Sequence, residues 1–102
     1  MAAMKLAFMA IVPGSDAEKD RSVLTTEFVE LITQLVPDRD AAVKKAKQLA
    51  DEGCAAIELC GGFGHLGTAK VVEAVAGKTS IGVVRFDIHP VLGGKSGDEV
   101  FQ

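Results

Sequence analysis

Apolar residues along the chain gather in short runs that polar segments containing glycine or proline separate. The densest run covers residues 5–12 (KLAFMAIV), and Pro13 and Gly14 follow it directly. A run of this length, closed by turn-forming residues, is typical of a buried strand. A polar loop over residues 14–22 follows.

Residues 23–36 (VLTTEFVELITQLV) are compatible with two structures. Their threonine, valine and isoleucine content favours a strand, whereas a stripe of apolar residues fits a helix. That stripe consists of Leu24, Phe28, Leu31 and Leu35. We expect a strand over residues 29–36.

A helix is predicted after Pro37. Asp38 is suited to cap its first turn, and Gly53 to end it. Between them, apolar residues recur with the helical period of 3.6 at Ala42, Val43, Ala46, Leu49 and Ala50.

Three further segments complete the pattern. Residues 55–60 and 81–86 have the character of short strands, and residues 68–76 repeat the helical pattern between them. Alternation of strands and helices favours right-handed crossovers and a parallel sheet, with all strand-to-helix loops on one edge. We therefore predict one α/β domain over residues 1–102, of order β-β-α-β-α-β, with a mostly parallel four-stranded sheet and two main helices. Residues 87–102 form an irregular, glycine-rich tail.

Two helices cover only one face of such a sheet. The other face, to which we assign apolar positions such as Ile57 or Leu59, then needs the tail or another subunit to shield it. This consideration predicts a homo-oligomer.

Composition narrows the function classes. The 102 residues suit a single domain, and 48% hydrophobic against 25% charged residues is the balance of a folded globular protein. With 11 basic and 14 acidic residues, a net charge of −3 and no tryptophan or tyrosine, nucleic acid is not an expected partner. The first apolar run is too short to span a bilayer, so we expect no membrane association and a cytoplasmic location.

Residues 62–67 (GFGHLG) carry the strongest local signal, a GxGxxG motif between a predicted strand and a predicted helix. Glycines at such a turn allow close approach, and the free N–H groups and helix dipole attract phosphate or carboxylate. The expected ligand-binding residues here are Gly61, Gly62, Phe63, Gly64 and Gly67. Only one predicted strand follows, whereas a dinucleotide domain needs two mononucleotide halves. A turn that binds nothing is the alternative.

The second signal is the segment RFDIHP over residues 85–90. Strand alternation directs Arg85, Asp87 and His89 to one face and Phe86 and Ile88 to the other. A parallel sheet brings that face close to the glycine turn. In the alternative interpretation, Arg85 and Asp87 form a structural ion pair and His89 shapes the turn before proline.

Three residues near this edge have catalytic chemistry. Histidine side chains can act as acid or base, which makes His65 and His89 catalytic candidates, and Cys60 is a candidate nucleophile. In the alternative interpretation, which is the commoner role of a cysteine, Cys60 is a small buried hydrophobe. Arg21, in the loop after the first strand, could clamp an anion beside the glycine turn. The alternative is a solvated polar loop, because charged loop residues are mostly exposed. Because local spacing fixes no third ligand beside Asp87 and His89, we predict neither a metal nor a cofactor.

Together these stretches resemble a family of small bacterial proteins of unknown function. The resemblance rests on ELCGGFG at residues 58–64, VRFD at 84–87 with His89-Pro90, and KSGD at 95–98. It covers nearly the whole chain and implies no activity, so it supports the layout and transfers no catalytic role.

Two hypotheses of function follow. The first is binding, with or without turnover, of a small anionic metabolite, its acidic group held by the glycine turn and Arg85 and its reactive part near His65 and His89. A mononucleotide or dinucleotide ligand is a variant of this hypothesis. The second is a non-catalytic oligomerising module in which the glycine turn and the tail serve assembly.

Overall fold

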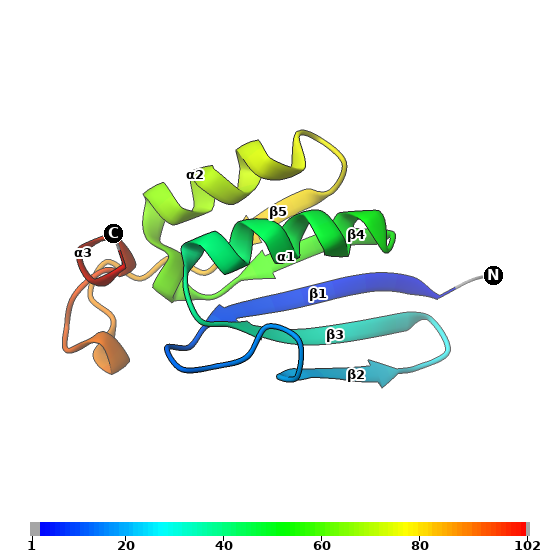
Figure 1. The fold of residues 1–102 in the computed structure, drawn as a ribbon, viewed down its shortest axis with the longest axis horizontal. Coiled ribbons are helices and arrows are strands. Elements are labelled where there is room, and N and C mark those ends of the chain that lie inside the picture. Colours follow the sequence, from blue (N-terminus) through cyan, green and yellow to red (C-terminus); the bar gives the residue numbers. More distant parts are fainter. Residues whose placement is uncertain (1–2, 102) are drawn as a thin grey trace.

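The first strand of the chain lies in the middle of the sheet. In the computed structural model, which describes residues 3–101, five strands follow the order β2-β3-β1-β4-β5 (Figure 1). The strands are β1 (Met4–Ile11), β2 (Arg21–Thr25), β3 (Val29–Val36), β4 (Cys54–Leu59) and β5 (Ser80–Val83). β1 is parallel to both neighbours, β3 and β4, and β5 is parallel to β4, whereas β2 runs antiparallel along the outer side of β3. The predicted α/β class with a mostly parallel sheet is confirmed.

The strand count was predicted one too low. Residues 23–36 contain neither a helix nor a single strand but most of a hairpin, in which β2 precedes the correctly predicted β3. Thr26 stabilises the turn, because its hydroxyl accepts a hydrogen bond from the Val29 N–H at 3.1 Å. The side chains of β2 after Arg21 are exposed, so this edge strand has no alternation of buried and exposed positions to reveal it.

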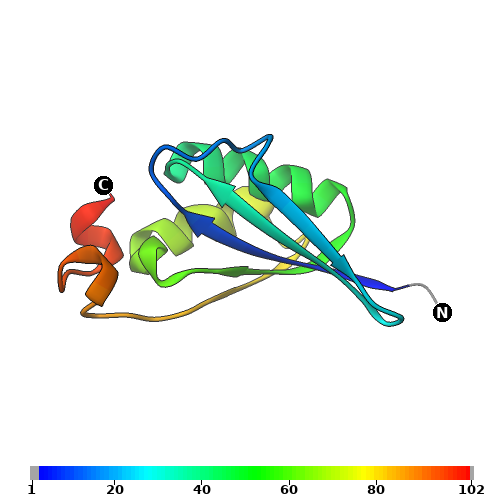
Figure 2. The ribbon, with the colours of Figure 1, turned by 90° about the horizontal axis from the view of Figure 1, so that it is seen from below.

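Two helices cover one face of the sheet and pack against each other (Figure 2). They are α1 (Arg39–Asp51) and α2 (Gly64–Val75). The predicted cap of α1 is confirmed, since the Asp38 carboxylate accepts a hydrogen bond from the Ala41 N–H at 2.8 Å. Gly53, which follows the helix, has a φ of +95°, a conformation that favours glycine.

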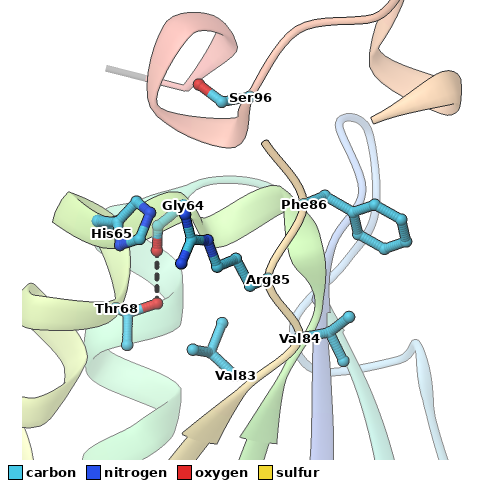
Figure 3. A pocket seen from close by; sticks show the side chains of 8 residues that line it. All are labelled: Gly64, His65, Thr68, Val83, Val84, Arg85, Phe86 and Ser96. Carbon is cyan, nitrogen blue, oxygen red and sulfur yellow. Dashed lines mark hydrogen bonds between the residues drawn. The ribbon is translucent and has the colours of Figure 1, made fainter. Parts of the chain in front are cut away.

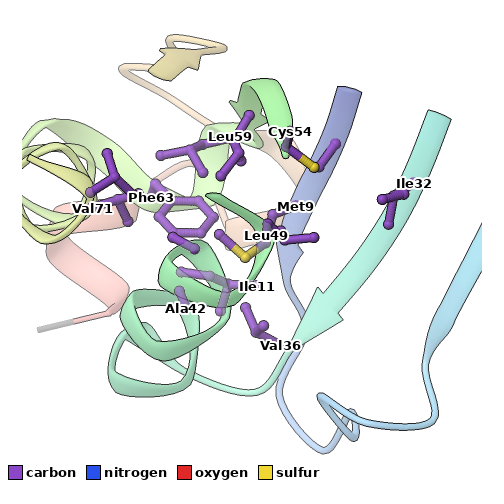
Figure 4. Packing of buried hydrophobic residues seen from close by; sticks show 14 residues of the cluster. Met9, Ile11, Ile32, Val36, Ala42, Leu49, Cys54, Leu59, Phe63 and Val71 are labelled. Atoms are coloured by element: carbon purple, nitrogen blue, oxygen red, sulfur yellow. The ribbon is translucent and has the colours of Figure 1, made fainter. Parts of the chain in front are cut away.

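The core lies between the helices and the sheet (Figure 4). Its residues point from alternate positions of the strands, as Met9, Ile32 and Leu59 do, and meet Leu49 of α1 and Val71 of α2. Ile57 and Leu59 belong to this core and are fully buried. Their assignment to the uncovered face was therefore wrong by one strand position, because a shift of one residue exchanges the two faces of a strand.

The last strand is shorter than predicted. β5 ends at Val83, and one further ladder hydrogen bond joins the Val84 N–H to the Leu59 carbonyl. β4 itself ends at Leu59, so the segment beyond Val84 has no strand to pair with. It leads into a tail with a 3₁₀ turn (Pro90–Leu92) and a short helix α3 (Gly97–Val100), which lies at the carboxyl end of the sheet (Figures 1 and 2). Residues 1, 2 and 102 of the predicted domain lie outside the described part of the chain.

Candidate anion-binding site

The glycine turn lies where predicted, at the carboxyl end of β4. A 3₁₀ turn (Gly61–Phe63) leads from the strand into α2. A Cβ atom added at Gly61 would collide with the Phe86 ring, and one at Gly64 would lie 2.6 Å from the Asp98 carboxylate. At Gly67 the same atom would lie 2.8 Å from Nε of Arg39. The glycines therefore make room for the protein's own tail and for an arginine of α1.

Asp98 occupies the amino-terminal end of α2. Its carboxylate accepts hydrogen bonds from the backbone N–H groups of His65, at 2.8 Å, and Leu66, at 3.0 Å. These are the donors that the GxGxxG motif was predicted to offer to a ligand. The motif does bind an acidic group, but in this structure that group belongs to the same chain.

Arg39 completes the contact from the opposite side. Its Nη2 donates to Asp98 Oδ1 at 2.8 Å and to the Phe63 carbonyl at 3.1 Å, and the side chain is only 8% exposed. Burial alone would raise the pKa of Asp98, but the N–H groups of His65 and Leu66 and the Arg39 guanidinium outweigh it and hold that pKa below its usual value.

A small pocket lies beside this contact, between the first turn of α2 and the chain after β5 (Figure 3). Its volume is about 100 Å³. It is lined by Gly64, His65, Thr68, Val83, Val84, Arg85, Phe86 and Ser96. Figure 3 shows the Arg85 side chain extending toward Gly64 and His65, while the Phe86 ring turns away. The Thr68 hydroxyl donates to the Gly64 carbonyl at 2.6 Å and so fixes the first turn of the helix.

Arg85 and Asp87 form an ion pair, as the alternative interpretation of this segment held. Nε of Arg85 donates to one carboxylate oxygen at 3.1 Å, and Nη2 donates to the other at 3.3 Å. Both side chains are more than two-thirds exposed, so the pair contributes little to stability. Its position beside the pocket leaves the guanidinium accessible to a ligand.

His89 does not join these two residues. Its ring lies against Phe86, with ring centroids 4.4 Å apart, and its Nδ1 accepts a hydrogen bond from the Val91 N–H at 3.2 Å. The prediction that it faces away from Phe86 is wrong, because the strand ends at Val83 and the two-residue period ends with it. The alternative is confirmed: His89 shapes the turn that follows.

Other candidates lie away from the pocket. Phe63 is fully buried in the core, and Gly61, Gly62 and Gly67 are buried too, so none of them is open to a ligand in this structure. Cys60 is half-buried and packs against the core. Of the predicted residues, only Gly64, His65 and Arg85 line the pocket.

The predicted position of Arg21, beside the glycine turn, was also wrong. Its guanidinium donates to both carboxylate oxygens of Glu52, at 2.7 and 3.1 Å, in a bond that raises the pKa of Arg21 and lowers that of Glu52. Glu52 follows α1, a 13-residue helix whose first residue, Arg39, meets the glycine turn. A helix of this length spans about 20 Å, so Arg21 is held too far away to clamp an anion there.

Sequence reasoning missed the role of Arg39. The signal was present, because a cation in the first turn of a helix opposes the helix dipole and calls for a compensating acid. That acid, Asp98, belongs to the KSGD stretch that carried the family resemblance.

Within residues 3–101, no three histidine, cysteine or acidic side chains are grouped closely enough to hold a metal ion. Nor does the same part of the chain contain a helix with the length and apolar character needed to cross a membrane.

Fold and site together define a small α/β domain in which a C-terminal tail places its own carboxylate on a glycine-rich strand-to-helix turn. The chain belongs to the family of unknown function DUF6506, which matches residues 4–99. No curated protein and no solved structure matches it.

Proposed function

We propose that this protein binds a small anionic metabolite in the pocket between α2 and the segment after β5. The observation that carries the proposal is the position of Arg85. Its guanidinium reaches toward the positive end of α2, and its hydrogen-bonding partner among the described residues is the exposed Asp87. A ligand's acidic group replaces Asp87 on Arg85 at small cost, because exposed ion pairs are weak.

The charges around the pocket favour an anion. Asp98 is already compensated by Arg39 and by two backbone N–H groups, so it repels a second acid less than a free carboxylate would. His65 lines the same pocket and can donate a further hydrogen bond. Arg85 and His65 would thus hold the acidic group from two sides.

The size of the pocket limits the ligand. Sites for drug-sized ligands usually have about 300–1,000 Å³, whereas this pocket has about 100 Å³. A carboxylate or phosphate carried on a few carbon atoms fits this space, and a nucleotide does not. The size therefore favours a metabolite over the mononucleotide or dinucleotide alternatives.

Turnover, if it accompanies binding, rests on His65. Of the three catalytic candidates it alone lines the pocket, because His89 stacks on Phe86 and Cys60 packs against the core. The alternative of a non-catalytic module is favoured by a different part of the molecule, the uncovered sheet face.

Binding is tested by following backbone amide chemical shifts while inorganic phosphate, a three-carbon carboxylic acid or AMP is added. We expect phosphate and the short acid to shift the amides of His65, Thr68 and Arg85, and AMP to bind more weakly. Arg85→Ala should weaken binding about tenfold or more, because it removes a charge-assisted hydrogen bond of roughly 1.5–3 kcal/mol. The free energy of unfolding of the Arg85→Ala variant should differ from that of the native protein by less than about 1 kcal/mol.

Lys44→Ala is the matched control. It removes the same charge from an exposed position on α1 and should leave binding unchanged. Shifts that are absent from the native protein, or that persist in Arg85→Ala, would exclude this pocket as the anion site.

A further inference from the structure

The sheet face opposite the helices is apolar across four strands. The register aligns Leu24, Leu31, Leu6 and Ala56 in one continuous row from β2 to β4. The adjacent row, which includes Ile32, Ala7 and Ile57, points to the helices and is buried, so strand alternation directs the leucine row to the open side. Leu24 is 65% exposed and Leu31 is 36% exposed.

Charge is nearly absent from this open face. Among the strand residues of the described chain that point to it, Glu58 is the one charged side chain. It lies beside Phe8, whose other neighbour in the register is Thr33. A surface with one charge in five strands is unlike an ordinary solvated sheet face, on which polar residues alternate with the core.

The tail does not cover this surface. From the sequence we expected either the tail or another subunit to shield this face. Asp98 instead holds the tail on the start of α2, at the carboxyl end of the sheet (Figures 1 and 2). The helices lie on the other side. The open face therefore remains free for another molecule.

The area is sufficient for a dimer. Five strands about 4.8 Å apart, with a mean length of about 20 Å, give a face of roughly 500 Å². Two such faces bury roughly 1,000 Å² together, which is the threshold for a stable biological interface. The apolar part of this face is therefore a few hundred Å² in size, and the largest apolar patch on a single protein is often functional.

We propose that a second copy of this chain packs on the open face, sheet against sheet. A two-fold axis parallel to β1, lying between the two sheets, places the Phe8 rows of the two copies opposite each other and exchanges the β3 side with the β4 side. Glu58 of each copy then faces Thr33 of its partner instead of the other Glu58. The threonine hydroxyl donates to the carboxylate, and the leucine rows of the two copies pack against each other.

Sedimentation velocity of the full chain at micromolar concentration tests this interface. We expect a species of twice 10.6 kDa. Leu31→Glu should weaken association about 100-fold, because each dimer would bury two unpaired carboxylates. Because Leu31 is exposed in the single chain, the Leu31→Glu variant should fold and keep the circular dichroism spectrum of the native protein.

Two further variants make the result decisive. Leu24→Lys alters the most exposed leucine of the same row and should also yield monomers, even if Leu31→Glu fails to fold. Val72→Glu places a charge at a 49% exposed position on α2 and should leave the dimer intact. A native chain that stays at 10.6 kDa, a dimer that survives both leucine substitutions, or a monomer that sediments with lipid vesicles would overturn the proposal.

Discussion

Asp98 caps a helix that begins 34 residues earlier. Phe63, at the cap position of α2, offers no side-chain hydrogen bond, so the helix start depends on this distant carboxylate. Asp98 also neutralises Arg39, which is buried against the same turn. One side chain thus satisfies two backbone donors and a buried cation, and its removal leaves all three without that partner.

We expect Asp98→Asn to lower the free energy of unfolding at neutral pH by about 2 kcal/mol. Breaking a fully buried pair costs about 3–5 kcal/mol, and Asp98 is partly exposed. In the folded native protein the pKa of Asp98 is lowered. The stability that the ionised Asp98 contributes is therefore fully present above its unfolded-state pKa of about 3.9, and it is lost as the pH falls through the folded-state pKa. Urea unfolding at neutral and acidic pH measures both effects.

Glu27→Gln is the control for that pH dependence, since it removes an exposed carboxylate in the turn between β2 and β3. It should leave the native pH profile in place. An equal stability difference between Asp98→Asn and the native protein at both pH values would show that the charge of Asp98 contributes nothing.

At the scale of elements, the tail and the glycine turn form one packed unit. A Cβ atom at Gly97 would collide with the Gly62 carbonyl, and the Phe101 side chain packs near the same glycine. The capping box of α3, in which Ser96 and Glu99 bond each other's backbone, holds this helix in place. Backbone contacts of this kind tolerate no added side chain.

Gly97→Ala should therefore loosen the tail, at a cost of about 1–3 kcal/mol for an overpacked contact. The readout is hydrogen exchange, which should accelerate at the amides of His65 and Leu66 because Asp98 withdraws from them. Gly82→Ala makes the same chemical change in β5, where the new methyl group meets no atom within 4 Å. Equal exchange rates in the two variants would argue against a tail held by this contact.

Elements that bury residues at a regular period could be predicted from the sequence, whereas elements without such a period could not be predicted. β1 and β3 were placed to within one residue, and α1 with its cap, because the core imposes a period on their sequences. β2 has only an exposed edge and no such period. The glycine turn was recognised by local spacing, but its acidic occupant lies more than 30 residues away, a separation that no local pattern encodes.

For the whole molecule, the asymmetry of the sheet is the dominant feature. The helices and the core lie on one side of the sheet, and the pocket lies at its carboxyl end. The apolar open face is on the opposite side of the sheet from the helices. Dimers formed through that face would leave both pockets accessible. Ligand binding and association are therefore expected to be independent, and a failure of one proposal does not affect the other.

The core itself depends on β1. Met9 is fully buried in this central strand, between the sheet and the helices (Figure 4). Met9→Ala should lower the unfolding free energy by about 2–5 kcal/mol, the range for large-to-small changes in a core. Urea denaturation measures it, and Met4→Ala, at a 59% exposed position of the same strand, should cost far less. Similar losses for the two variants would mean that the packing around Met9 is not tight.

The position of β1 also has a consequence for the order in which the chain folds. Its pairing with β3 joins residues 25 apart, such as Met4 and Val29, and its pairing with β4 joins Leu6 to Ala56, which are 50 apart. Among the strand pairs of the described residues, the β2–β3 hairpin is the one local pair. A sheet dominated by distant pairs folds slowly, because long loops must close before any contact is gained. The central strand is thus completed only after most of the domain is available to it. Because closure of these loops limits the rate, we expect Met9→Ala to slow refolding and Gly97→Ala, which lies outside the sheet, mainly to speed unfolding.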